Sequence, residues 1–163
     1  MKIGVIADTH IPERADSLSK EIEEAFQQAD LIIHAGDFTS LEVLNKLKMI
    51  APVKGVHGNM DQFDIVNILP KKDIVKCGKF NIGVFHGFGD PTGIIEQLKR
   101  EFKNDKVDVI IFGHSHRPMN EKKENILFFN PGSPTDTVFA PFKSYGIIEI
   151  NDKIEAKIVR LKI

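Results

Sequence analysis

The stretch VIIFGHSHRP, residues 109–118, sets two histidines directly behind a run of apolar residues. The apolar run has the length and composition of a buried strand. A polar turn that caps this strand would explain His114 and His116 without any further function. Alternatively, the strand fixes both imidazoles at a functional site, and the rest of the chain has to decide between these two interpretations.

The first sixty residues alternate buried strands with amphipathic helices. Strands are expected at 2–7, 31–37 and 52–56, and helices at about 16–28 and from 39 onward. Thr39 and Glu42 match a capping box, which predicts that the second helix begins there. A β-α-β-α-β order is typical of a parallel sheet with crossover helices.

The remainder of the chain contains further strands and one further helix. Strands are expected at 73–77, 80–87, 107–116, 126–130, 144–150 and 153–159. Gly78 is expected to lie in a hairpin turn, and Asp90 and Pro91 have the features of a helix N-cap and a first-turn proline. We therefore predict one α/β domain, residues 1–163, made of two packed mixed sheets flanked by helices.

Composition excludes several classes of protein. The 163 residues are 42% hydrophobic and 28% charged, with a net charge of −1 and no long run of one sign. This balance favours a globular domain and argues against a general nucleic-acid-binding or membrane surface. The one cysteine, Cys77, excludes an internal disulfide and fits a reducing compartment. Since no signal peptide or membrane span is recognisable, we expect a cytoplasmic protein, with a homo-oligomer left open.

Histidines, carboxylates and an asparagine gather at the carboxyl ends of the predicted strands. The residues in question are Asp8, His10, Asp37, Asn59, His86, His114 and His116. Because ligands of open α/β sheets bind at the carboxyl ends of the strands, five strand ends would deliver seven candidate metal ligands to one edge. Each piece alone has an ordinary explanation, such as a turn or a strand cap. Their combined order, D-x-H, G-D, G-N, H-G and G-H-x-H, favours a metal site.

These motifs resemble those of the calcineurin-like metallophosphoesterase superfamily, and in particular its small prokaryotic phosphodiesterase branch. They read DTH (8–10), GD (36–37), GNMD (58–61), HG (86–87) and GHSH (113–116), and a later NPGSP (130–134) is also typical of that branch. The resemblance implies a four-layer α-β-β-α sandwich with a two-metal site at the sheet edge.

The resemblance also implies a division of the ligands between two ions. Asp8, His10, Asp37 and His116 would hold one ion, and Asn59, His86 and His114 the second, with Asp37 bridging both. Mixed imidazole and carboxylate ligands suit Mn, Fe, Ni, Co or Zn better than Mg or Ca, and we expect manganese first. Two such ions, about 3.5–4 Å apart, can activate a bridging hydroxide and neutralise charge on a phosphoryl oxygen.

One position departs from the superfamily pattern. The family often has G-N-H, where the histidine is thought to assist the reaction, whereas this chain has Met60. Because Met cannot donate a proton, we expect protonation of a poor leaving group to be weaker or to be supplied elsewhere. The departure favours the small prokaryotic branch over the protein phosphatases, and we expect a metal-dependent hydrolase of small phosphodiesters. The alternatives are a phosphomonoesterase, or a scaffold like the retromer subunit that shares this fold but has an incomplete site. The complete ligand set favours an enzyme.

Five further residues are assigned to the surroundings of the site. His34 is interpreted as a core residue or as one that orients a ligand, and His57 as a structural or rim residue. Asp61 is expected to orient a neighbour rather than to bind metal. Arg117 is a candidate phosphate ligand, although an exposed arginine at a strand start explains it equally well. Asn130 lies in a Pro/Gly turn and either lines the pocket or only shapes it.

Overall fold

Two five-stranded sheets make up the centre of the protein, whose structure is a computed structural model that describes residues 1–162. The first sheet has the order β10-β9-β1-β2-β3, with bounds Ile154–Arg160, Ser144–Ile150, Lys2–Ile6, Leu31–His34 and Val53–Gly55. The second has the order β4-β5-β6-β8-β7, with bounds Lys72–Cys77, Phe80–Phe85, Val109–Ile111, Ile126–Asn130 and Met119–Lys123.

Both sheets are mixed. In the first, β1, β2 and β3 are parallel, while β9 is antiparallel to both β1 and β10. In the second, β5, β6 and β8 are parallel, while β4 and β7 pair antiparallel at the two edges. Each sheet therefore carries a run of three parallel strands whose carboxyl ends lie together, at one edge of the first sheet and in the middle of the second.

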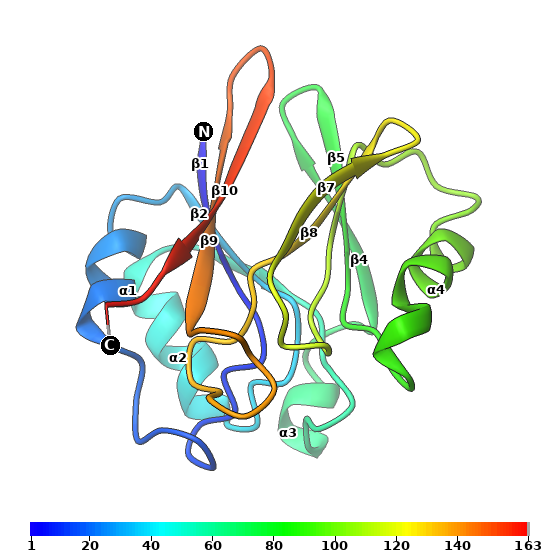
Figure 1. The fold of residues 1–163 in the computed structure, drawn as a ribbon. Helices are drawn as coiled ribbons and strands as arrows, with labels where there is room; N and C mark the ends of the chain where they lie inside the picture. The colour runs from blue at the N-terminus through cyan, green and yellow to red at the C-terminus, as the bar shows by residue number, and fades with distance from the viewer. Residues whose placement is uncertain (163) are drawn as a thin grey trace.

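The two sheets pack face to face, and helices cover their outer faces, as Figure 1 shows. Ile3, Val5 and Ile33 of the first sheet belong to the same buried cluster as Val84 and Phe129 of the second. Burial of branched side chains between two sheets stabilises such a sandwich at roughly 25 cal/mol for each Å² of apolar area.

Helices α1 (Lys20–Phe26) and α2 (Leu41–Ile50) pack on the first sheet through residues such as Phe26 and Leu44. Helix α4 (Ile94–Glu101), preceded by the short 3₁₀ helix η1 (Pro91–Gly93), packs on the second sheet through Leu98. The predicted α-β-β-α arrangement of two mixed sheets flanked by helices is confirmed.

Glycines in the sheets let aromatic rings approach the backbone. A Cβ on Gly4 of β1 would lie 2.6 Å from the Phe26 ring, and a Cβ on Gly83 of β5 would lie 2.6 Å from the Phe102 ring. Each ring therefore occupies the space that a side chain would fill, and this close contact fixes a helix against its sheet.

Two helix starts differ from the sequence prediction. The first helix begins at Lys20 rather than near residue 16, because the Ser19 side chain accepts a hydrogen bond from the Ile22 amide. The second helix is capped by Ser40 rather than Thr39: Ser40 Oγ accepts from the Glu42 amide at 3.1 Å. Thr39 instead has a left-handed backbone, with φ of 64°, and takes no part in the cap.

Candidate metal centre

All seven candidate ligands follow strands of these two parallel runs. Asp8 and His10 follow β1, Asp37 follows β2, and Asn59 follows β3 in the first sheet, whereas His86 follows β5 and the pair His114 and His116 follows β6 in the second. Five of them are buried, and only His114 and Asn59 are more accessible. The site therefore lies where the edges of both sheets meet.

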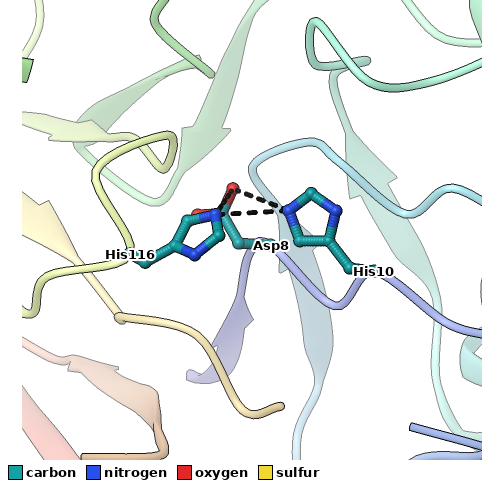
Figure 2. Close-up of side chains that lie close together, drawn as sticks. All are labelled: Asp8, His10 and His116. Carbon is teal, nitrogen blue, oxygen red and sulfur yellow. Dashed lines mark hydrogen bonds and ion pairs between the residues drawn. The ribbon is translucent and has the colours of Figure 1, made fainter. Parts of the chain in front are cut away.

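One cluster consists of Asp8, His10 and His116: Figure 2 shows Asp8 and His10 from the segment after β1 meeting His116 from the loop after β6. His116 Nε2 lies 3.4 Å and His10 Nε2 lies 3.8 Å from Asp8 Oδ1. The two imidazole nitrogens are 3.2 Å apart. This spacing allows a single small cation to contact all three side chains.

A second cluster consists of Asp8, Asp37 and His86. His86 Nε2 lies 3.2 Å from Asp37 Oδ2 and 3.7 Å from Asp8 Oδ1. Asp37 Oδ2 also lies 3.6 Å from His10 Nε2, so its carboxylate reaches toward the first cluster. The sequence prediction made Asp37 the one bridging carboxylate. In the structure Asp8 belongs to both clusters, and Asp37 belongs to the second and approaches His10 of the first.

Asn59 and His114 lie beside each other at the border of this second cluster. His114 Nδ1 is 3.2 Å from Asn59 Oδ1, and its ring centre is 5.5 Å from that of His86. His114 Nε2 lies 2.7 Å from the carbonyl oxygen of Gly89. The structure thus brings both residues to the site, with an amide oxygen and an imidazole on its more open side.

The hydrogen bonds of the buried histidines fix which nitrogen faces the clusters. His86 Nδ1 donates to the Ala35 carbonyl oxygen at 2.7 Å, and His116 Nδ1 donates to Asp136 Oδ2 at 2.6 Å. Their Nε2 atoms therefore face the carboxylates, and within residues 1–162 His86 Nε2 has no well-directed hydrogen bond. Outward Nδ1–H bonds of this kind are typical of metal-binding imidazoles, and the buried Nε2 fits a metal ligand.

The charges of the site perturb the pKa values of its members. Burial acts to raise the pKa of Asp8, but the neighbouring His86, His10 and His116 lower it well below the usual range. Burial acts to lower the pKa of His86, but Asp8 and Asp37 raise it to about 9. A proton on His86 thus balances the buried carboxylates when no cation is bound, and a divalent cation would replace it.

Strained backbone is concentrated at the same residues. Asp8, His10, Asp37, His114 and His116 have φ values of 53°, 41°, 58°, 70° and 58°, in the left-handed region. This conformation costs a non-glycine residue on the order of 1 kcal/mol or more, and such strain is typical of functional sites. The fold therefore directs these five side chains toward the site, at the energetic cost of a left-handed backbone.

Asp61 holds the loops that carry Asp37 and Asn59. Its carboxylate accepts hydrogen bonds from the amides of Asp37 at 2.9 Å, Gly58 at 2.8 Å and Thr39 at 2.8 Å. A Cβ on Gly58 would overlap the Asp37 carboxylate, so only glycine fits there. Both oxygens of Asp61 are thus occupied by backbone amides.

His34 and His57 lie outside the two clusters. His34 is fully buried and stacked on Phe38 with ring centres 3.5 Å apart, and its Nδ1 accepts from the Gly36 amide at 3.1 Å. Burial is the main reason why the pKa of His34 lies well below its ordinary value, so the ring is neutral. His57 is half-buried, and its amide donates to the Pro70 carbonyl oxygen at 3.0 Å.

A cleft of about 970 Å³ opens beside the clusters. His10, Asp37, Asn59, His114 and His116 contribute to its lining, together with Arg117, Met60, Arg14 and Phe139. Asn130 does not line the cleft: it is fully buried, and its Nδ2 donates to the Gly113 carbonyl oxygen at 3.0 Å and to Ser115 Oγ at 3.1 Å. These contacts place Asn130 behind the histidine loop, where it shapes the site and does not reach a substrate.

Sequence reasoning missed Asp136 and Arg14. Asp136 is fully buried and joins His116 to Arg14, whose Nη1 lies 2.8 Å from Asp136 Oδ1. Asp136 lies in a turn twenty residues after His116 and outside the recognised motifs, so no local pattern in the sequence marks it.

Two buried Asp/His clusters at the edge of an α-β-β-α sandwich define a metallophosphoesterase-like protein, and comparisons with known proteins agree. Residues 1–153 match the calcineurin-like phosphoesterase superfamily domain, and the chain belongs to this family. It is 42% identical over 163 residues to a probable metallophosphoesterase of Methanocaldococcus jannaschii, covering 99% of this chain and 82% of that protein.

Two further relatives differ in what they imply. A phosphodiesterase of Methanocaldococcus jannaschii is 28% identical over 145 residues, covering 81% of this chain and 83% of that protein. A crystal structure of a Vps29 variant from Entamoeba histolytica is 24% identical, with a TM-score of 0.77, and the match covers 99% and 100% of the two chains. The second similarity shows the fold alone. Within the described residues, no helix has the length and apolar character needed to cross a membrane.

Proposed function

We propose that this protein is a metal-dependent phosphodiesterase that uses two divalent transition-metal ions. The observation that carries the proposal is the convergence of the Asp8 and Asp37 carboxylates with the Nε2 atoms of His10, His86 and His116 in a buried site. Two ionised carboxylates side by side in a protein interior need compensating positive charge. The mixed oxygen and nitrogen donors suit Mn, Fe, Co, Ni or Zn, and manganese is the first candidate.

The ligand set divides between two positions. His10 and His116 would hold one ion with Asp8, and His86, Asn59 and His114 would hold the other, with Asp37 between them. When bound, the ions would activate a water molecule as the nucleophile and supply positive charge for the phosphoryl oxygens. The Nδ1–H bonds of His86 and His116 keep these two rings oriented toward the site.

Met60 stands where the family often has a histidine, and this departure favours the small phosphodiesterase branch and therefore diesters over monoesters. The residue is 56% exposed and lines the cleft, and its amide donates to Asp37 Oδ1 at 2.8 Å. A methionine cannot protonate a departing group, and the amide bonds to Asp61 leave that carboxylate badly placed to do so. Rate should therefore depend steeply on the leaving group, because general acid help is typically worth about 10²–10⁴-fold.

Two alternative functions are less well supported. The phosphodiesterase relative of Methanocaldococcus jannaschii supports diester hydrolysis over a phosphomonoesterase. A scaffold without catalytic activity would be expected to lack ligands, whereas all seven candidate positions here carry metal-binding side chains. The open cleft suits a small phosphodiester.

The test is an activity panel on metal-stripped protein. Matched diesters and monoesters, namely bis(p-nitrophenyl) phosphate and p-nitrophenyl phosphate, would be assayed with Mn, Fe, Co, Ni and Zn added back singly. We expect no activity without metal and a higher kcat/KM for the diester with at least one metal. Preference for the monoester would support the phosphomonoesterase, and inactivity with every metal and both esters would support the scaffold.

A further inference from the structure

Arg14 lies in the wall of the cleft, next to the first Asp/His cluster. It follows His10 by four residues, and its amide donates to the His10 carbonyl oxygen at 2.8 Å, so the turn after β1 fixes its backbone relative to His10. Its side chain is 30% exposed and lines the cleft together with His10 and His116. Arg14 as a residue is exposed, like Arg117, but its guanidinium lies against the wall of the cleft and is held there by its neighbours.

Two neighbours fix the guanidinium. Arg14 Nη1 lies 2.8 Å from Asp136 Oδ1, and Arg14 Cζ lies 5.8 Å from the centre of the Phe139 ring. Asp136 is itself rigidly held, since it is fully buried and accepts hydrogen bonds from the amides of Val138 and Phe139 at 2.8 and 3.1 Å. A guanidinium ordered in this way loses little further conformational entropy when it binds an anion.

Asp136 also sets the position of Arg14 relative to the metal ligands. Its Oδ2 accepts from His116 Nδ1 at 2.6 Å while its Oδ1 accepts from Arg14. The two oxygens of one carboxylate therefore hold Arg14 and His116 side by side, and the other nitrogen of His116 faces Asp8. A phosphoryl group at the clusters would lie next to this guanidinium.

We propose that Arg14 binds a non-bridging oxygen of the substrate phosphate, an inference that rests on the proposed phosphodiesterase function. A guanidinium has five N–H donors. Within residues 1–162 the hydrogen bond of this guanidinium is the one from Nη1 to Asp136, so its other donors are available. The donors that remain match the geometry of a phosphate. The acidic residue Glu13 lies in the same wall. Its carboxylate is engaged by Thr39, whose Oγ1 donates a hydrogen bond to it.

Arg117 is the competing candidate, because it lines the same cleft. It is exposed. Within residues 1–162 its backbone amide donates to Ser115 Oγ at 3.3 Å, but its guanidinium forms no hydrogen bond. An unrestrained arginine has to lose side-chain entropy on binding, which weakens its contribution. The geometry therefore favours Arg14 as the phosphate-binding arginine.

The test compares Arg14→Gln and Arg14→Lys with wild type and with Arg117→Gln. Arg100→Gln is the matched control, because Arg100 is an exposed arginine on α4. Calorimetry on manganese-loaded protein would give the Kd of inorganic phosphate, and steady-state kinetics with bis(p-nitrophenyl) phosphate would give KM and kcat. Glutamine is chosen because its amide can still donate to Asp136.

We expect Arg14→Gln to raise the phosphate Kd and KM by about tenfold or more, since charge-assisted hydrogen bonds are typically worth that much. Arg14→Lys should recover part of this loss, and manganese content and Tm should match those of Arg100→Gln. An unchanged Kd, a loss of manganese in parallel with the loss of phosphate, or the full effect in Arg117→Gln alone would overturn the inference. If wild type hydrolyses no ester, the proposed function fails, while the calorimetric Kd still decides the role of Arg14.

Discussion

The two sheets contribute different chemistry to the site. The first sheet supplies both carboxylates and the amide, through Asp8, Asp37 and Asn59, together with one imidazole. The second sheet supplies imidazoles only, through His86, His114 and His116. Negative charge is thus gathered at one edge, and nitrogen donors face it from the other.

This difference between the two sheets explains why the site depends on the packing of the whole sandwich. The first edge alone would hold two neighbouring carboxylates with His10 as their one imidazole, and the second edge alone has no anionic ligand to attract a cation. Only the buried cluster between the sheets brings Asp8 to within 3.7 Å of His86 Nε2 and 3.4 Å of His116 Nε2. The core of the fold and the candidate metal centre are therefore coupled.

The largest expected effect comes from within the first sheet. Asp37→Ala should reduce kcat/KM by more than about 100-fold, beyond the range typical of outer hydrogen-bond partners, because a charged carboxylate between the two clusters is lost. Asn59→Ala should cost less, because Asn59 is a neutral, exposed candidate ligand at the border. Steady-state kinetics and metal analysis of both variants measure this, and an Asp37→Ala enzyme as active as wild type would refute the assignment.

An intermediate effect is expected on the side of the second sheet. Asp136→Asn keeps an acceptor for His116 Nδ1 but removes the charge, so metal affinity should fall by about 10–100-fold. Asparagine is preferable to alanine because the Asp136 carboxylate also accepts backbone amides at 2.8 to 3.2 Å. Metal titration measures the change against Asp152→Asn, an exposed acidic residue in the last hairpin. Equal affinity in both variants would mean that Asp136 does not support His116.

The sequence predicted the strand ends, and with them where the seven candidate ligands lie, because apolar runs mark strands and parallel strands end at a common edge. It did not predict β7, whose residues after Met119 are polar and exposed at a sheet edge. Nor did it predict Asp136 or the left-handed backbone of Asp8 and His10. Those features arise from tertiary contacts between segments far apart in the chain, which hydrophobic periodicity cannot report.

The smallest expected effect is the number of protons released when metal binds, and it distinguishes a carboxylate of the first sheet from an imidazole of the second. The lowered pKa of Asp8 keeps it ionised, so it releases no proton when metal binds near neutral pH, whereas His86, with a pKa of about 9, has to lose one. Metal binding at pH 7.5 should therefore release about one proton or more per chain, and this release should decline as the pH rises through 9. Calorimetry in buffers of different ionisation enthalpy counts these protons. A release of zero that is independent of pH would argue against His86 as a ligand.

We expect the meeting edges of the two sheets to hold two metal ions. The most direct measurement is the metal content per chain of stripped protein that is reloaded with manganese and freed of excess, determined by elemental analysis beside the activity of the same sample. We predict two ions per chain, with activity rising as the second ion binds. One ion or fewer in a fully active enzyme would contradict the claim.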